Sequence, residues 1–317
     1  MDKKGSAAPL REKLKRRAAW LAKLRYFFDR RGFVEVTPPC LMRQCIRDTH
    51  IHPYAVGESY LQTSPELAMK QMLCEGSGSI YAITPVFRQH ESGDQHHTEF
   101  TMLEWYQMDA KFEDGIELIR LLSDTVFERP TTYLNYCDAF TRVLDIHPID
   151  GEINKIREMV SRFAPNLQDV GGLDRDACLD VLLTEAVLPA LPSKSSVVIG
   201  RYPASQSALA NLDPHNRCLA LRFEWFLEGL ELGNGYDELC DVDEMVIRDR
   251  SVAEKREQQG HDPLVGPSDL FTLMSRPGMP SSTGMAVGIE RLMMAADRID
   301  GKSSSFEDVQ WVERFGR

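Results

Sequence analysis

Long apolar runs are missing from this 317-residue sequence. No stretch approaches the roughly 18 apolar residues that a membrane-spanning helix requires. The N-terminus is polar and has no signal-peptide core. These two absences predict a soluble, cytoplasmic protein with no membrane partner.

The cysteine pattern excludes a disulfide framework. The seven cysteines are odd in number, scattered, and never spaced as Cys-x-x-Cys, which is typical of a reduced intracellular protein. One short segment does hold Cys40, Cys45, His50 and His52. Because their spacing matches no common zinc ligand set, we do not expect zinc there.

Excess positive charge is also missing. The 37 Lys and Arg residues stand against 48 Asp and Glu, a formal net charge of −11. A protein that coats nucleic acid needs clustered cations, so the composition disfavours that class. Residues 11–31 are the exception, with nine Lys and Arg against Glu12 and Asp29. They form either a solvated helix face or a docking surface for an acidic partner.

The sequence disfavours the two common nucleotide-binding folds, the P-loop fold by its motifs and the Rossmann fold by the order of its predicted elements. No Gly-x-x-x-x-Gly-Lys-Ser/Thr occurs, which excludes a P-loop. Helical spacing predicts helices over 14–28, from Ser64-Pro65-Glu66 to about 74, and over 114–127, 241–259 and 268–274. Strand patterns cover 33–36, 80–87, 99–107, 196–202, 219–228 and 230–239, and a strand–helix junction lies in 284–294.

Strands that return so late along the chain, with few βαβ alternations, favour an α+β fold over a Rossmann fold. We expect an antiparallel sheet flanked by helices. The expected organisation is a single domain over residues 1–317, with a mainly helical insertion at about 130–195.

Four charged residues on or at the ends of strands suggest chemistry on ATP. Arg88 in TPVFRQHES and Arg291 in GMAVGIERLMM each follow an apolar strand, where a guanidinium can hold phosphate oxygens. Glu224 and Glu231 lie on successive strands and could bind Mg²⁺. Adenylation of a carboxylate depends mainly on such positioning and electrostatics. Any one of the four alone would fit a surface ion pair equally well.

A second set of polar residues alternates along two strands. Glu104 and Tyr106 point to one side of the first strand. On the second, Asn234, Tyr236 and Glu238 share a side. Carboxylates among apolar neighbours are costly unless paired. A substrate ammonium or a structural lysine or arginine would balance them, and the spacing leaves both open.

These segments resemble a known family. RGFVEVTPP (31–39), FRQHESGDQHHTEFTMLEWY (87–106) and GMAVGIERL (284–292) resemble motifs 1, 2 and 3 of the class II aminoacyl-tRNA synthetases. LQTSPELAMK (61–70) and RFEWFLEGLELGNGYDEL (222–239) narrow the resemblance to the lysyl-tRNA synthetase branch. The resemblance implies the class II catalytic core.

Within this branch the sequence is most similar to the free-standing paralogues that ligate lysine or (R)-β-lysine to elongation factor P. The motif 1 helix begins almost at the N-terminus, so we expect no anticodon-binding domain. Segments 201–210 and 62–66 read like the paralogues. Ala286 stands where lysyl-tRNA synthetases carry glycine, a change that suits a β-amino acid.

The resemblance implies an AMP-forming ligase. Its cofactors would be ATP and Mg²⁺, its acceptor a lysine of elongation factor P, and its assembly a homodimer built on motif 1. No stable tRNA binding is expected.

The resemblance also assigns roles to individual residues. Arg88 would contact the substrate carboxylate and the α-phosphate, and Arg291 the γ-phosphate, as the catalytic pair. The remaining ATP contacts would come from His96, Phe100 stacked on adenine, Gly288, and the magnesium ligands Glu224 and Glu231. The amino acid would be held by Ser64, Glu66, Glu104, Tyr106, Asn234, Tyr236, Glu238 and Ala286.

The segment after Arg88 departs from the family pattern. Gln89-His90 replaces Asn-Glu, and His97-Thr98 replaces Asn-Pro. We interpret these histidines as loop substitutions rather than catalytic bases, because the attacking carboxylate is already ionised. Two alternatives remain: a lysyl-tRNA synthetase-like core acting on another acceptor, and a non-catalytic synthetase-like regulatory or binding subunit.

Overall fold

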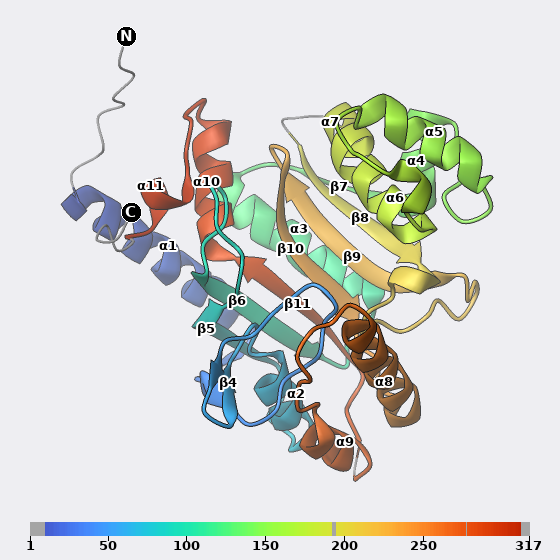
Figure 1. Ribbon diagram of the computed structural model, residues 1–317. Helices are drawn as coiled ribbons and strands as arrows, with labels where there is room; N and C mark the ends of the chain where they lie inside the picture. The colour runs from blue at the N-terminus through green and yellow to red at the C-terminus, as the bar shows by residue number, and fades with distance from the viewer. Residues whose placement is uncertain (1–9, 192–194, 277, 312–317) are drawn as a thin grey trace. The chain divides into compact units, whose positions relative to one another are not determined.

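A computed structural model describes residues 10–191, 195–276 and 278–311. The chain forms two compact units, one from residues 1–109 and 240–317 and the other from residues 110–239 (Figure 1). None of the helices in the described ranges carries an apolar stretch long enough to cross a bilayer. The prediction of a single domain over 1–317 stays a prediction.

The first unit is built on a four-stranded sheet. Its elements are α1 (Leu10–Asp29), β1 (Val34–Glu35), β2 (Leu41–Met42), β3 (Ala55–Val56), β4 (Ser59–Leu61), α2 (Glu66–Cys74), β5 (Ile80–Phe87), β6 (Glu99–Met108), α8 (Val242–Gln258), α9 (Ser268–Met274), β11 (Ser282–Gly288), α10 (Ile289–Ile299) and α11 (Phe306–Val309). The strand order is β1-β5-β6-β11, with the outer strand β1 parallel to β5 and the other pairs antiparallel. Strands β2, β4 and β3 form a second, antiparallel sheet.

The two faces of the first unit's main sheet differ in character. Phe28 of α1 stacks on Tyr81 at 4.8 Å between ring centroids and packs against Trp105 at 5.2 Å. Helix α1 therefore covers one face with aromatic contacts. Because side chains alternate along a strand, Glu104 and Tyr106 emerge on the opposite face, where they hydrogen-bond to each other. The alternation predicted for residues 99–107 is confirmed.

Two ion pairs join α1 to α10, the helix that follows β11. The Arg17 guanidinium lies 2.9 Å from Glu290 Oε1, and both side chains are largely buried. The backbone N–H of Thr101 donates to Glu290 Oε2 at 3.0 Å. Arg16 pairs with Asp297 further along α10, also at 2.9 Å. Part of the basic stretch 11–31 is thus neither a solvated face nor a docking surface, because it holds the first unit together.

The second unit is also built on a four-stranded sheet. Its elements are α3 (Phe112–Phe127), β7 (Thr131–Asn135), α4 (Tyr136–Leu144), α5 (Ile153–Phe163), a 3-10 turn (Val170–Gly172), α6 (Arg175–Leu182), a π-helical turn (Leu183–Val187), α7 (Leu188–Ala190), β8 (Ser196–Pro203), a 3-10 turn (Ala204–Gln206), β9 (Leu219–Leu227) and β10 (Leu230–Asp237). The order is β10-β9-β8-β7, and only the outer strand β7 runs parallel to its neighbour.

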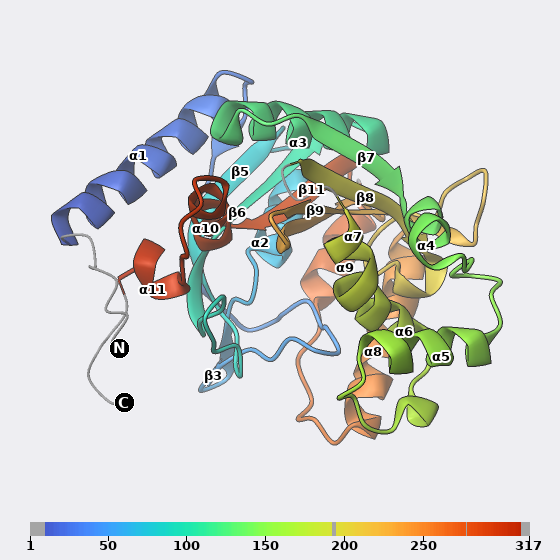
Figure 2. The same ribbon diagram turned by 90° about the horizontal axis from the view of Figure 1, so that it is seen from above.

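Helices cover both faces of the second unit's sheet, with α3 on one and α4 to α6 on the other (Figure 2). On β9, Trp225 meets Phe127 of α3 at 5.9 Å between ring centroids. The next residue, Phe226, belongs to the apolar cluster of α4, α5 and α6. Glu224 therefore lies on the face that α4 to α6 cover.

The α+β class and the predicted helices and strands are confirmed, with ends displaced by a few residues. Two features were not predicted. Residues 131–135, within the segment expected to be mainly helical, form β7, and residues 192–194 of that segment lie outside the described ranges. The small β2-β4-β3 sheet was missed because strands of two or three residues carry no readable alternation.

Replacing Arg17 with Met should destabilise the protein by about 3 kcal/mol, because the buried Glu290 carboxylate loses its counter-charge. The measurement is urea unfolding at neutral pH, with Arg11→Met on the exposed side of the same helix as the matched control. The double variant Arg17→Met with Glu290→Met should recover part of the loss. Equal midpoints for Arg17→Met and Arg11→Met would contradict the assignment.

Candidate active site

Glu104 lies at the centre of a polar cluster in the first unit. Its side chain is almost fully buried. The Tyr106 hydroxyl donates to Glu104 Oε1 at 2.7 Å, and the Ser64 hydroxyl donates to Oε2 at 2.6 Å. Burial, followed by the nearby charge of Glu66, raises the pKa of Glu104 to about 7, although the two hydroxyls pull it downward. Burial therefore makes the charged form of Glu104 costly.

Small residues flank Glu104 on both sides. Its cross-strand partner on β5 is Ala82, and its partner on β11 is Ala286. Cross-strand partners project from the same face of a sheet. The Ala286 methyl group therefore borders the carboxylate.

Lys70 is a fully buried cation that the sequence reasoning missed. Its ammonium lies 2.6 Å from Glu66 Oε1, one helical turn away on α2. The i, i+4 spacing in LQTSPELAMK was the available signal. For Glu66 the balancing charge is thus a structural lysine. For Glu104 both oxygens accept from neutral hydroxyls, and the charge of the nearby Lys70 lowers its pKa.

The start of α2 is tied to the same cluster. Helix α2 begins at Glu66, and its N-cap residue is Pro65 rather than Ser64, which the Ser-Pro-Glu pattern would place there. The Ser64 hydroxyl accepts from the backbone N–H of Glu66 at 3.0 Å while it donates to Glu104. One serine therefore satisfies a helix N–H and orients the buried carboxylate.

Arg88 lies at the end of β5, over an aromatic ring. Its guanidinium carbon is 5.1 Å from the centroid of Phe100. Arg88 Nε donates to the Thr63 carbonyl at 3.1 Å, and Nη1 lies 3.5 Å from Glu91. These contacts hold the guanidinium beside the ring that the resemblance assigns to adenine.

Arg291 in the first turn of α10 contacts His96 of the loop between β5 and β6. The two residues are far apart in sequence, yet both were expected at the triphosphate. Gly288 immediately precedes α10, and a Cβ there would meet the Arg291 side chain at 3.6 Å. The structure thus brings Arg291, His96 and Gly288 together.

In the second unit, Glu224 is held by two donors. The Tyr202 hydroxyl donates to its Oε2 at 2.6 Å, and Arg222 forms an ion pair with its Oε1. Burial raises the pKa of Glu224, the Arg222 charge opposes that rise, and the nearby Glu231 adds to it. Arg222 was missed, although its position two residues before Glu224 places both on one strand face.

The polar residues of β10 join this network. Asn234 is the cross-strand partner of Glu224. Its amide donates to the Tyr236 hydroxyl at 2.8 Å, and its carbonyl oxygen accepts from Arg222 Nε at 3.3 Å. Glu238 is buried just beyond the end of the strand, where Asn211 donates to its backbone carbonyl at 2.8 Å.

The carboxylates of Glu224 and Glu231 fit a magnesium ion in chemical type. Mg²⁺ prefers carboxylate oxygens and takes its other ligands from phosphates and water. No group of three or more His, Cys, Asp or Glu in the described ranges could hold a metal ion without such help. Cys45, one of the clustered cysteines, instead faces the Val265 carbonyl at 3.8 Å.

Comparison with known proteins defines the class. Residues 5–300 match the family described as tRNA synthetases class II (D, K and N). The chain therefore belongs to the class II tRNA synthetase family, as its motifs implied.

Curated relatives narrow the comparison further. The chain is 35% identical over 303 residues to the elongation factor P–(R)-β-lysine ligase of Photobacterium profundum, covering 91% of this chain and 93% of the relative. It is 35% identical to the ligase of the same name from Klebsiella pneumoniae, over 92% of both chains. For that of Yersinia enterocolitica the identity is 36%, again over 92% of both. The resemblance to this branch is confirmed.

The raised pKa of Glu104 predicts a specific pH dependence of stability. Its folded pKa of about 7 exceeds the ordinary 4.5, so the folded state binds the proton more tightly and stability falls as pH rises through this window. Glu104→Gln removes that loss and should stabilise the protein by ~1–3 kcal/mol near pH 8, but little near pH 4.5.

Chemical denaturation at the two pH values measures this difference. Glu99→Gln, at an exposed position on the same strand, is the matched control and should show no such dependence. A pH-independent difference between Glu104→Gln and the natural protein would refute the assignment.

Proposed function

We propose that this protein is an ATP-dependent ligase. It activates lysine or (R)-β-lysine as an adenylate and transfers the acyl group to a lysine ε-amine of elongation factor P. The observation that carries the proposal is identity of about 35% over nine-tenths of both chains to ligases that bear this name. The buried, hydroxyl-bound Glu104 supports a cationic amino acid as the substrate.

The first step joins the amino acid to AMP. The amino-acid carboxylate attacks the α-phosphorus of ATP, the bond to the β-phosphate breaks, and pyrophosphate leaves. The nucleophile is already ionised at neutral pH, so no side chain has to remove a proton. Arg88 would hold the carboxylate and α-phosphate, and Arg291 the γ-phosphate, as fixed positive charges. The contact of Arg291 with His96 supports the placement of both at the triphosphate.

The second step forms an amide. A neutral ε-amine of the acceptor lysine attacks the acyl carbon of the adenylate, the bond to AMP breaks, and the amine releases its extra proton. Mg²⁺, where bound, would neutralise phosphate charge. Glu224 and Glu231 would supply its protein ligands, and Arg222 would hold Glu224 in place through their ion pair.

Recognition of the amino acid would centre on Glu104. A substrate ammonium would stabilise its ionised form and so lower the pKa that burial raises. The resemblance adds Tyr106 and Glu238 to the side-chain ammonium, and Glu66 and Asn234 to the rest of the amino acid. Because Glu66 already forms an ion pair with Lys70, we assign Glu104 as the acid that binds the substrate ammonium.

We also propose that the protein works as a homodimer in the cytoplasm. Large apolar side chains are exposed on α1 and on the strand that follows it: Leu14 is 50% exposed, Tyr26 66% and Val34 56%. Exposed apolar surface of this kind favours a protein contact. The free cysteines of the described residues are consistent with a reducing compartment.

Pyrophosphate exchange tests the first step. We expect exchange with (R)-β-lysine or lysine. The exchange rate should fall about 10²–10³-fold in Arg291→Ala, because the guanidinium that stabilises the negative charge developing on the phosphates is lost. Arg298→Ala on the same helix is the matched control. Transfer of labelled amino acid to elongation factor P tests the second step. Absence of exchange with every amino acid tried would favour the non-catalytic alternative.

Ala286 should set the choice between amino-acid isomers. Ala286→Gly removes the methyl group beside Glu104, and we expect the ratio of kcat/KM for (R)-β-lysine over lysine to fall about tenfold. Val287→Ala, which shortens the next side chain on the opposite face of β11, should leave this ratio unchanged. An unaltered ratio in Ala286→Gly would remove Ala286 from the substrate site.

A further inference from the structure

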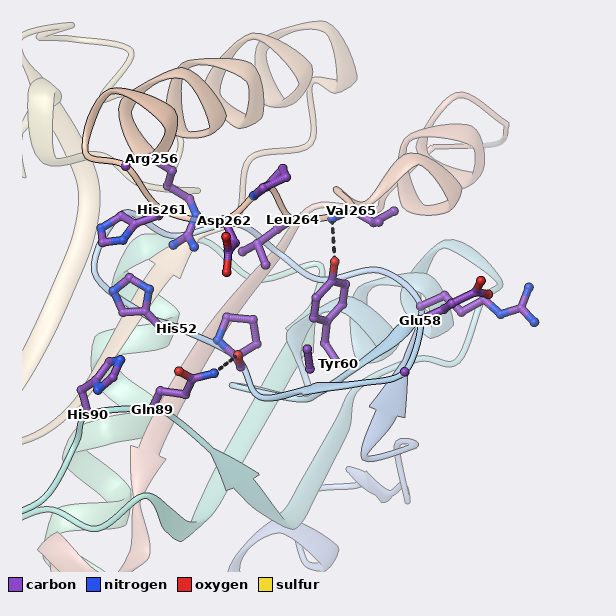
Figure 3. A pocket seen from close by; sticks show the side chains of 16 residues that line it. His52, Glu58, Tyr60, Gln89, His90, Arg256, His261, Asp262, Leu264 and Val265 are labelled. Carbon is purple, nitrogen blue, oxygen red and sulfur yellow. Dashed lines mark hydrogen bonds between the residues drawn. The ribbon is translucent and has the colours of Figure 1, made fainter.

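A cavity of about 760 Å³ lies within the first unit, and none of the residues that line it is assigned above to ATP or the amino acid. Its walls come from the segment 43–60, from Gln89 and His90 after β5, and from the segment 256–265 at the end of α8 (Figure 3). Cavities of this size hold small molecules.

Three histidines gather in this cavity from three separate segments. The ring of His52 lies 4.5 Å from that of His261 and 5.8 Å from that of His90, measured between centroids. Burial, followed by His261, Arg256 and His90, lowers the pKa of His52. Positive or potentially positive groups therefore face one another at this point of the protein.

Arg256 brings a buried, unsatisfied donor to the same place. It is only 4% exposed, and its Nη1 donates to the Asp48 carbonyl at 2.8 Å. Its Nε is buried and has no hydrogen-bond partner among the described residues. A buried donor without a partner costs free energy that a bound acceptor would recover. Figure 3 shows the Arg256, His261 and His52 side chains converging on one end of the cavity.

The cavity is lined by two arginines and three histidines, together with two carboxylates. Arg43 and Arg256 are permanent cations, and a guanidinium matches the geometry of an oxyanion. Of the two acidic lining residues, Asp262 is exposed and lies at the same end as Arg256 and His261, whereas Glu58 lies at the end remote from the histidines (Figure 3). Among the described residues no group of His, Cys, Asp and Glu is arranged for a metal ion.

We propose that this cavity binds a small anion that carries a phosphate or sulfate group, through the Nε–H of Arg256 and the imidazoles of His52 and His261. Binding takes up protons. The anion favours the imidazolium form of His52, which burial and then His261, Arg256 and His90 oppose, whereas Asp48 favours it. Affinity therefore rises as the pH falls from about 8 to about 6, the range in which histidine changes its charge.

The cavity also borders the segment that carries Arg88. The Gln89 N–H donates to the His52 carbonyl at 2.8 Å, and its side-chain amide donates to the Pro53 carbonyl at 2.7 Å. His90 follows in the left-handed region, with a φ of 65°. His90 is exposed, so its replacement tests the electrostatics of the cavity without disturbing buried packing.

Calorimetric titration with sulfate, whose charge is constant over this pH range, tests the proposal. We expect saturable binding that strengthens about tenfold or more between about pH 8 and about pH 6. Parallel titrations with inorganic phosphate and glycerol phosphate compare the affinity for a free ion with the affinity for an organic phosphate, and the tighter of the two indicates the source of the group. Shifts in the ring resonances of His52, His90 and His261 on titration would locate the site.

Two variants and one control complete the test. His90→Glu places a carboxylate at the cavity and should weaken sulfate binding at least about tenfold, or ~1.4 kcal/mol. His52→Gln should reduce the pH dependence. His215→Gln, at an exposed histidine of the second unit, should change neither. No saturable binding, or equal binding by His90→Glu and the natural protein, would overturn the proposal.

Discussion

Strand β6 has to satisfy opposite demands on its two faces, and the first unit is organised around this requirement. Trp105 packs against Phe28 of α1, whereas Glu104, its neighbour in sequence, is a buried carboxylate on the other face. A one-residue shift in register would exchange the two and bury the carboxylate among aromatic rings. Two contacts from other elements favour this register: Glu290 accepts from the backbone N–H of Thr101, and the Ser64 hydroxyl donates to Glu104.

The second unit meets the same requirement with the same pair of residue types. Trp225 on β9 packs against α3, and Glu224 beside it faces the opposite way towards Tyr202 and Arg222. In both units a tyrosine hydroxyl donates to the glutamate, and burial raises the pKa of the carboxylate. In each unit the packing of a tryptophan thus fixes the position of a neighbouring glutamate, and burial makes the ionised form of that glutamate unfavourable unless a cation lies nearby.

The sequence predicted these strand faces because alternation is a local property. It predicted Glu104 beside Tyr106 for that reason, and the motifs predicted the meeting of Arg291 with His96. It did not predict that Lys70 neutralises Glu66, since a surface helix pair and a buried one have the same spacing. Nor did it predict the histidine cavity. Its walls come from segments that only tertiary packing brings together, and the spacing of the cysteines and histidines around His52 indicates no common ligand set.

Ser64 has a consequence that extends beyond the carboxylate it touches. A hydroxyl has one proton, which here points to Glu104, while its oxygen accepts the first free N–H of α2. The same oxygen atom therefore takes part in two hydrogen bonds, one to a carboxylate on β6 and one to the first turn of α2. A hydrogen bond to a charged acceptor is stronger than one to a neutral acceptor, so protonation of Glu104 weakens the first of the two. The start of a helix and a strand of the neighbouring sheet are in this way joined through a single side-chain atom.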